Sequence, residues 1–562
     1  MVSAPGFSYP VDFYASYGLP YGYPATAQWP GQGYYDPYAT YPQPFSQPAL
    51  AAAPVASAPI SPLLASPAAA TLDISTQPIV FPLPSLSLGG KALFTLKHPI
   101  LAATFWKNNP KAKINGETAN QRWGMFAGVV SQLNAKNQRN LLGQMTSGRL
   151  FSTDAEDGRS TLSHMYQVIA TPRAEGMNPQ DIINDVARLL AQPESITQRF
   201  APLKPNYIRA LMNFLNAGRG PKLAQPVTPE SFSDHSATCV SSSVMYTLFA
   251  KQPSEVVRHI AELTSPRQYF TERATAYQIS PENPALAAQK LEQYKVPAKQ
   301  LDANNFMIKV ELPYTGLVRA LNQQNNPEPE TQSVVESAYQ SAVTKLAAFN
   351  YEPGLGTLVL PDGKLDKDPG IVADQKTLME SIMKDTGPVM QVDYQVTAAD
   401  RNNEPFLMGY LRPFEKTYND LVSALKAGHN VIIGIVDTDK TGNTKGRLNL
   451  KHEVTLVGHK DGMFQIADSD DEIPRLIHKP ASELIPQIHH AGLPETIGRA
   501  VQKDISQLSG RYMTPDAGDA KNFKLIDIVP PQIQPQFLAD FQQRQAQEMQ
   551  RAVAVPNYSV SA

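Results

Sequence analysis

The sequence predicts an α+β protein in which an all-helical segment precedes a domain that combines a helical layer with an antiparallel sheet. Three observations support this. Apolar residues recur at spacings of three and four over about residues 91–228, a helix of the same type starts at Cys239, and strand-like runs with a hairpin signal follow between residues 431 and 468. A chain of 562 residues has room for several packed regions. We expect four, with bounds at residues 1–90, 91–228, 229–497 and 498–562.

The first ninety residues contain no Lys or Arg, and they consist largely of Tyr, Pro, Ala and Ser. Such a composition does not bury enough apolar surface to form a core, so we expect a disordered leader. The leader lacks the positive start and apolar run of a Sec-type signal, and no later run is apolar enough to span a bilayer. The sequence therefore predicts a soluble protein without a membrane span, located in the cytoplasm or exported by a leaderless route.

The helical segment 91–228 contains three amphipathic runs. Asn178 before Pro179 is a cap-like start for the second run, and Gly218 ends the third. A stripe of large apolar residues on one helical face is typical of a packed core, so the segment is predicted to be structural, with a regulatory role over a cleft as an alternative. The runs are Trp123, Phe126, Val129, Val130 and Leu133; Ile182, Ile183, Val186 and Leu189; and Ile208, Leu211, Met212 and Leu215.

The single cysteine lies at a predicted helix start. Apolar residues follow at four-residue spacing from Val240, which places Cys239 in the first turn with Thr238 or Ser236 as N-cap. The unpaired amides and the positive end of the helix dipole favour thiolate over thiol at such a position. A free cysteine is more often a small buried hydrophobe, so a purely structural role for Cys239 stays open.

His452 and Asp468 are expected to meet across a hairpin. Residues 452–457 and 463–468 have the character of strands, and the Asp461-Gly462 pair between them is a strong turn signal. Antiparallel pairing centred on Lys460 would place His452 directly opposite Asp468, close enough for a hydrogen bond. A Cys-His-Asp nucleophile site forms if the fold also brings Cys239 to this hairpin.

Charge and cysteine content argue against several other classes of protein. Lys+Arg 49 against Asp+Glu 51 gives a formal net charge of −2, which does not favour a nucleic-acid partner. One cysteine rules out an intramolecular disulfide and a multi-cysteine zinc site. His489 and His490 lie in a polar stretch typical of solvated surface, and a metal site needs three or more converging ligands. We therefore expect no metal and no cofactor.

A resemblance to a known family joins these elements. Residues 418–428 are a predicted helix that ends in Leu-x-x-Gly, and a buried strand at 431–436, the hairpin that begins with His452 and a closing Asp-Ser follow. This order resembles the second half of papain-like cysteine peptidases, including bacterial enzymes that trim double-glycine leaders. Residues 334–339 are similar to the Glu-x-Ala-Tyr helix of the calpain branch. The resemblance covers about residues 232–484 and implies a papain-like fold.

The resemblance implies a role for each residue of the site. Cys239 would be the nucleophile, His452 the general base and then the general acid, and Asp468 the group that orients the imidazole. The glutamine that completes the family's oxyanion hole does not carry over, because Ser233 occupies its usual place. Gln198 could take this role only if the intervening segment were an insertion. Further cleft candidates are Thr238, His235 and Ser469.

The sequence thus predicts a thiol hydrolase, most simply a cysteine peptidase that acts on a protein or peptide substrate. Two alternatives stay open. The same triad can deamidate glutamine or transfer an acyl group to an amine. The fold can also serve as a catalytically silent binding or scaffold protein. The C-terminal region is predicted to contain a strand at 523–529 and a Gln-rich helix through Met549.

Overall fold

The computed structural model describes residues 81–506, except for gaps at 199–202, 234–237, 282, 294–297, 323–329, 346–349, 367–372, 383–387, 400–404, 413, 438–448 and 471–474. The first eighty residues of the predicted leader therefore lie outside the described part. So do the C-terminal strand and Gln-rich helix predicted after residue 506. Helix α1 (Leu88–Lys97) starts within the last residues assigned to the leader, and the hydroxyl of Ser87 caps it by accepting a hydrogen bond from the amide of Gly90.

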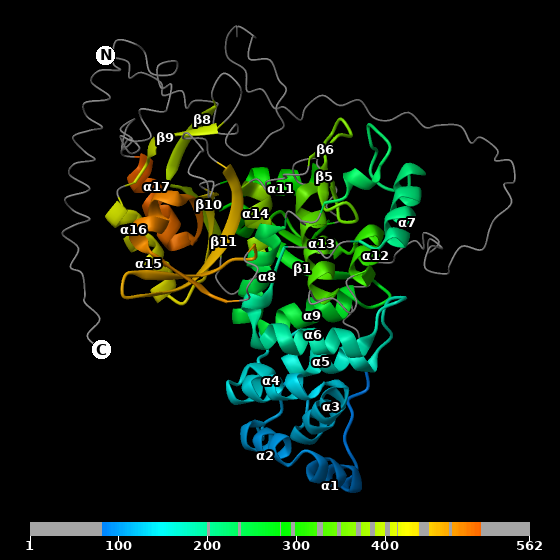
Figure 1. The fold of residues 1–562 in the computed structure, drawn as a ribbon. Helices are drawn as coiled ribbons and strands as arrows, with labels where there is room; N and C mark the ends of the chain where they lie inside the picture. Colours follow the sequence, from blue (N-terminus) through cyan, green and yellow to red (C-terminus); the bar gives the residue numbers. More distant parts are fainter. Residues whose placement is uncertain are drawn as a thin grey trace, which may run out of the picture. The chain divides into compact units, whose positions relative to one another are not determined.

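The segment that was predicted to be helical consists mainly of helices (Figure 1). Two of these helices begin or end at the residues predicted from the sequence. The side chain of Asn178 accepts a hydrogen bond from the amide of Gln180, which confirms the predicted cap. Gly218 follows the third predicted helix with a φ of 69°, a conformation that glycine adopts at little cost. The further helices of the segment are α2 (Pro99–Asn108), α3 (Ala119–Gln132), α4 (Ala135–Thr146), α5 (Thr161–Ala170), α6 (Pro179–Ala191) and α7 (Pro205–Asn216).

The helices on the two sides of residue 228 share one core. Helices α8 (Cys239–Lys251), α9 (Pro253–Leu263) and α13 (Glu330–Thr344) follow the helical segment. Leu101 of α2, Val186 of α6, Val244 of α8 and Val335 of α13 belong to one cluster of buried apolar side chains. The helix that begins at Cys239 is therefore held by packing against elements from both regions.

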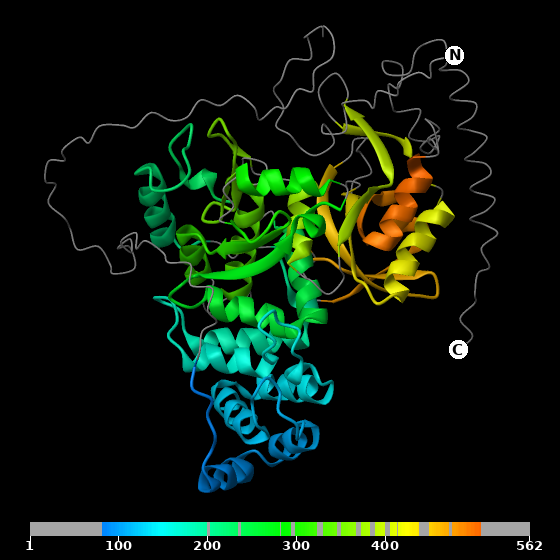
Figure 2. The ribbon, with the colours of Figure 1, turned by 180° about the vertical axis from the view of Figure 1, so that it is seen from behind.

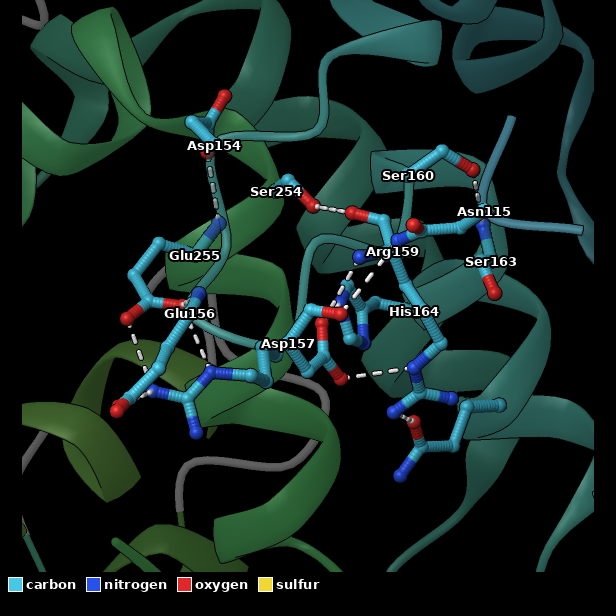
Figure 3. A network of polar contacts seen from close by, with 12 residues as sticks. Asn115, Asp154, Glu156, Asp157, Arg159, Ser160, Ser163, His164, Ser254 and Glu255 are labelled. Atoms are coloured by element: carbon cyan, nitrogen blue, oxygen red, sulfur yellow. Dashed lines mark hydrogen bonds and ion pairs between the residues drawn. The ribbon is translucent and has the colours of Figure 1, made fainter. Parts of the chain in front are cut away.

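A partly buried polar network joins the loop before α5 to the start of α9 (Figure 3). Arg159 donates to Asp157 at 2.7 Å, and Asp157 also contacts the buried imidazole of His164 at 3.1 Å. Asp154 accepts from the backbone amide of Glu255 at 3.0 Å, in the first turn of α9. These carboxylates satisfy donors of helix ends and of buried side chains, so the network stabilises the junction of the two helices.

The second half of the chain contains a six-stranded antiparallel sheet of order β13-β12-β11-β10-β14-β7. Ile433 packs in one cluster with Leu421 of α15 (Phe414–Lys426) and Val501 of α17 (Glu495–Ser506), whereas Ile432 joins the cluster of α8. Figure 2 shows the sheet and its neighbouring helices from behind. Helices thus cover both faces, and the fold is α+β as predicted. The strands are β7 (Val389–Asp393), β10 (Val431–Asp437), β11 (Asn449–Lys460), β12 (Met463–Ala467), β13 (Ile477–Pro480) and β14 (Ile488–Pro494).

The smaller elements between α9 and β14 were not predicted from the sequence. A three-stranded sheet has the order β1-β3-β2, a second has the order β4-β5-β6, and β8 pairs with β9. Their bounds are β1 (Tyr269–Thr275), β2 (Ala298–Gln300), β3 (Asn305–Glu311), β4 (Asn350–Glu352), β5 (Thr357–Val359), β6 (Leu365–Asp366), β8 (Gln395–Ala399) and β9 (Pro405–Tyr410); the helices are α10 (Ala276–Ile279), α11 (Pro284–Gln293), α12 (Tyr314–Asn322), α14 (Ala373–Ser381) and α16 (Ala481–Leu484).

The predicted hairpin exists, but its turn is tighter than expected. Lys460 pairs with Met463, which leaves Asp461 and Gly462 as a two-residue turn. Both residues have positive φ, at 52° and 77°, as a type I′ turn requires. The Asp-Gly signal was therefore correct, while the centre of the hairpin lies beyond Lys460.

The pairing of His452 directly opposite Asp468 was wrong for this reason. A bulge between Leu456 and Gly458 shifts the register, and Thr455 pairs with Ala467. If this pairing continued by one residue, residue 454 would lie opposite Asp468. His452 would then lie two residues further along β11. The two side chains nevertheless meet diagonally across the hairpin, a distance that long side chains can span.

Candidate active site

Cys239 is the first residue of α8 and is half-buried. The predicted N-cap hydrogen bond is not made by Thr238, whose hydroxyl instead donates to Oε2 of Glu336 at 2.7 Å. The alternative cap, Ser236, lies outside the described residues. In an α-helix the first four amides have no partner within the helix, so the amide of Cys239 belongs to a set of donors at the positive end of the dipole.

His452 and Asp468 are joined by a short hydrogen bond. Nε2 of His452 lies 2.6 Å from Oδ1 of Asp468, and the two side chains are 14% and 19% exposed. The backbone amide of Asp470 donates to the same oxygen at 2.9 Å. Asp468 follows directly after β12, so the strand end and the amide of Asp470 fix the carboxylate that holds the imidazole.

The other side of the imidazole faces the thiol. Burial by itself lowers the pKa of His452, but hydrogen bonds to Asp468 and Cys239, together with the charges of both groups, raise this pKa well above its usual value. Burial raises the pKa of Asp468, but the hydrogen bond and the charge of His452, the amide of Asp470 and the charge of Lys479 together lower it below its usual value. Because Asp468 engages Nε2, the ring nitrogen that remains for the sulfur is Nδ1. One imidazole thus connects a thiol with a carboxylate.

Packing of α8 along β11 brings together groups that are far apart in the sequence. The hydroxyl of Thr455 in β11 donates to the backbone carbonyl of Ser243 in α8 at 3.4 Å. Ala467 of β12 and Val457 of β11 contact the same apolar cluster as Val244 of α8. The N-terminus of α8 therefore lies next to the hairpin that carries His452 and Asp468.

Glu336 of α13 is a site residue whose role the sequence did not predict. Its carboxylate is fully buried and accepts hydrogen bonds from the hydroxyls of Thr238 and Ser242, at 2.7 and 2.6 Å, and from the amide of Gln332 at 2.8 Å. Thr238 and Ser242 flank Cys239 in the sequence, so Glu336 fixes the first turn of the nucleophile helix. The available signal was a single acid among small and apolar residues in 334–339.

Gln198 lies beside the loop that carries Asp468. Its backbone amide donates to the carbonyl of Ser469 at 3.0 Å, and the residue is buried. Its neighbour Thr197 exchanges hydrogen bonds with the side chain of Gln332, which also binds Glu336. The segment of Gln198 is thus tied both to the Asp468 loop and to the network around Thr238, although residues 199–202 and 234–237 on the way to Cys239 lie outside the description.

The remaining cleft candidates are placed differently. The amide of Ser233 donates to the carbonyl of Leu355 at 2.9 Å, and its own carbonyl accepts from Arg319 of α12 at 2.9 Å. The backbone amide of Ser233 is therefore already used and is no oxyanion donor. His235 lies outside the described residues. Ser469 is buried and contributes its carbonyl to the contact with Gln198.

The prediction that His489 and His490 belong to a solvated stretch was wrong. Both residues are buried in β14. Nε2 of His490 lies 2.6 Å from Oε1 of Glu453, whose other oxygen accepts from Nζ of Lys376 at 3.0 Å. Burial, with the neighbouring His490, lowers the pKa of His489 to about 4. A His-His pair in a polar-looking sequence is thus part of the sheet interior.

No protein-family model, no curated protein and no solved structure matches this chain. Within residues 81–506 as described, none of the helices combines the length and the apolar character needed to cross a bilayer. The assignment of a function therefore depends on the geometry and chemistry of the site alone.

Proposed function

We propose that this protein is a thiol hydrolase of papain-like design, most simply a cysteine peptidase that acts on a protein or peptide substrate. One observation carries the proposal: the imidazole of His452 is hydrogen-bonded at Nε2 to Asp468 and on its other side to Cys239, at the N-terminus of a helix. An imidazolium and a helix N-terminus both stabilise a thiolate, which is the reactive form of cysteine.

The reaction follows from these contacts. The sulfur of Cys239 attacks the carbonyl carbon of the scissile amide. The oxyanion that forms accepts a hydrogen bond from the backbone amide of Cys239. Nδ1 of His452 donates its proton to the leaving amine, which departs and leaves a thioester on Cys239. Nδ1 then takes a proton from water, the hydroxide attacks the thioester, and the acid product leaves. Asp468 keeps the imidazole oriented throughout.

Gln198 is the candidate for the second oxyanion donor. Its support is the hydrogen bond of its backbone to Ser469, one residue after Asp468, and its burial in a segment bound to the network of Glu336. At the sequence position that the family uses, this chain has Ser233, which carries no side-chain amide. An amide side chain from a preceding insertion can supply the same donor, since the reaction requires a position in space and not a spacing in the sequence.

A catalytically silent scaffold is the second candidate. The observation that favours it is a serine at position 233 in place of the family's glutamine, since removal of one oxyanion donor costs a factor of about 10²–10³ in rate. Water and amines can both accept the acyl group from the same thioester, so a deamidase or acyltransferase would use the same triad.

The test is the rate of alkylation of Cys239 by iodoacetamide against pH in the folded protein. We expect labelling well below about pH 8.5, the usual thiol pKa, and loss of this low-pH labelling in His452→Ala. His478→Ala is the matched control, because His478 is an exposed histidine of β13 in the same sheet. Slow labelling in the wild type, or equal labelling in wild type and His452→Ala, would overturn the proposal and favour the scaffold.

A second step separates hydrolysis from reactivity alone. The wild-type protein is incubated with a mixture of peptides of many sequences, and the new termini are identified by mass spectrometry. New termini that are absent with Cys239→Ala support a peptidase. Mass increments that correspond to deamidation or amine transfer, without new termini, would assign the same triad to the alternative reaction.

A further inference from the structure

Four strands of the large sheet align a row of residues that includes Glu453, the neighbour of His452. Glu453 of β11 pairs with Gly434 of β10, Gly434 pairs with His490 of β14, and His490 pairs with Asp393 of β7. Directly paired residues of an antiparallel sheet share one face. A Cβ at Gly434 would lie 2.3 Å from the ring of His490, so only glycine leaves space for His490 to reach Glu453 across β10.

A bulge in β14 adds His489 to this row. His490 pairs with Gly434 and Ile488 with Ile435, so His489 is an extra residue without a partner position in β10. In a regular strand two consecutive side chains point to opposite faces, but a bulge re-aims one of them. As a result Nδ1 of His489 and Nδ1 of His490 lie 2.9 Å apart. The bulge brings two imidazoles together in the sheet interior.

We infer that Asp393, His489 and His490 form a binding site for a divalent transition metal, with Zn²⁺ as the first choice. One ring nitrogen of each histidine and one carboxylate oxygen of Asp393 lie within 4.8 Å of one another. Two imidazoles and a carboxylate are a ligand set that zinc takes in proteins, with a fourth position left for solvent. This departs from the sequence-based expectation of no metal, because the bulge that makes the ligands converge has no sequence signal.

The groups around the three ligands support this assignment. Glu453 engages Nε2 of His490 at 2.6 Å, which leaves Nδ1 as the nitrogen that can bind a metal. The amide of Gln391 donates to Oδ1 of Asp393 at 3.2 Å. Metal-binding histidines commonly hold a carboxylate with their other ring nitrogen, and such partners fix the tautomer and the orientation of the ring. Lys376 binds the far oxygen of Glu453 and balances its charge.

A second cluster in the described residues has similar ligand types, but an arginine lies among them. Glu255, His259 and Glu272 also converge. There, however, Arg258 donates to Glu255 at 2.7 Å and also to Glu272. The positively charged guanidinium thus binds both carboxylates in place of a metal ion, so we assign no metal to this cluster.

The consequence of a metal at Asp393, His489 and His490 is mechanical. The ion would join β14 to the edge strand β7, and through His490 it would fix Glu453, the neighbour of His452 in β11. The inference does not depend on the proposed hydrolase activity, because none of the three ligands belongs to the Cys239 site.

The test is the binding of Zn²⁺ and Co²⁺ to the full chain in a Cys239→Ala background, which removes the thiol as a competing ligand. We expect one equivalent of Zn²⁺, visible absorption from bound Co²⁺, and at least tenfold weaker binding for Asp393→Asn and for His489→Gln. His478→Gln is the control and is expected to bind like its parent. Absence of binding, or equal binding by all variants, would overturn the inference.

X-ray absorption at the zinc edge of the parent protein keeps the inference testable if the variants fail to fold. Two imidazoles and one oxygen ligand, with Zn–N distances of about 2.0–2.1 Å, are expected. A shell of oxygen ligands alone, or a single imidazole, would contradict the site. The inference would also be overturned if the wild-type protein showed a sulfur ligand to zinc and the Cys239→Ala protein bound no zinc. That result would place the ion at the thiol.

Discussion

The pKa values of two buried histidines on the same sheet shift in opposite directions. His452 in β11 lies between the carboxylate of Asp468 and the thiol of Cys239, and its pKa is raised. His489 in β14 lies against another imidazole, and its pKa falls to about 4. Burial lowers the pKa of both rings, so the charge of the partner decides the outcome. One ring is therefore suited to hold and transfer a proton, and the other stays neutral and suited to bind a cation.

The largest expected effect is a loss of stability at Glu453, the carboxylate that contacts His490. Glu453→Gln leaves the buried ammonium of Lys376 without its carboxylate, and breaking a buried pair in this way costs about 3–5 kcal/mol of the free energy of unfolding. Urea unfolding measures the effect. Glu483→Gln, at an exposed glutamate of α16, is the control and is expected to change the free energy of unfolding by less than about 0.5 kcal/mol. A loss below about 1 kcal/mol in Glu453→Gln would show that the pair is not buried as described.

The next effect belongs to catalysis alone. Gln198→Ala is expected to lower kcat by a factor of about 10²–10³ with little change in KM, because an oxyanion donor acts in the transition state. Peptide hydrolysis, with a substrate found by the peptide mixture, measures the effect. Gln192→Ala, an exposed glutamine in the same segment, is expected to retain full activity. If Gln198→Ala retained its kcat, the second donor would have to come from another residue.

A smaller effect is expected at the support of the nucleophile helix. Glu336→Gln places an amide among three donors, so at least one of Thr238, Ser242 and Gln332 loses its acceptor. A lost buried hydrogen bond to a charged group costs about 1–3 kcal/mol of the free energy of unfolding. Because the loss displaces the first turn of α8, the alkylation of Cys239 should slow as well. Thermal unfolding and iodoacetamide labelling of the same sample test both parts. Destabilisation with unchanged labelling would assign Glu336 to stability only.

The smallest expected effect is the pH dependence of stability that His452 contributes. Its folded-state pKa lies above the unfolded value of about 6.5, so the folded protein binds the proton more tightly. The stabilisation is therefore fully present below about pH 6.5 and is lost as the pH rises through the raised pKa. Urea unfolding of wild type and His452→Gln across this range should show a difference that shrinks with rising pH. A difference that grows with pH would contradict the raised pKa.

Some elements of the site were predictable from local sequence. The helix that starts at Cys239, the strand from Val431 and the Asp461-Gly462 turn were all predicted, because spacing and turn chemistry act over a few residues. The register of the hairpin was not predicted correctly, because the hairpin turns at Asp461 and Gly462 and not at Lys460, and the bulge between Leu456 and Gly458 shifts the pairing by one residue. His452 and Asp468 are nevertheless partners, because their side chains are long enough to bridge the wider diagonal gap.

Local sequence patterns were enough to name the candidate site residues: a single cysteine at a helix start, one histidine in a strand and one aspartate after the next strand. The tertiary structure decided which of the other polar groups join them. Glu336 accepts hydrogen bonds at the first turn of α8, and Gln198 lies against Ser469. A bulge turns His489 toward His490 inside the sheet. The reason is physical, because periodicity and turn signals are local, whereas register, bulges and the pairing of buried polar groups are set by packing between segments hundreds of residues apart.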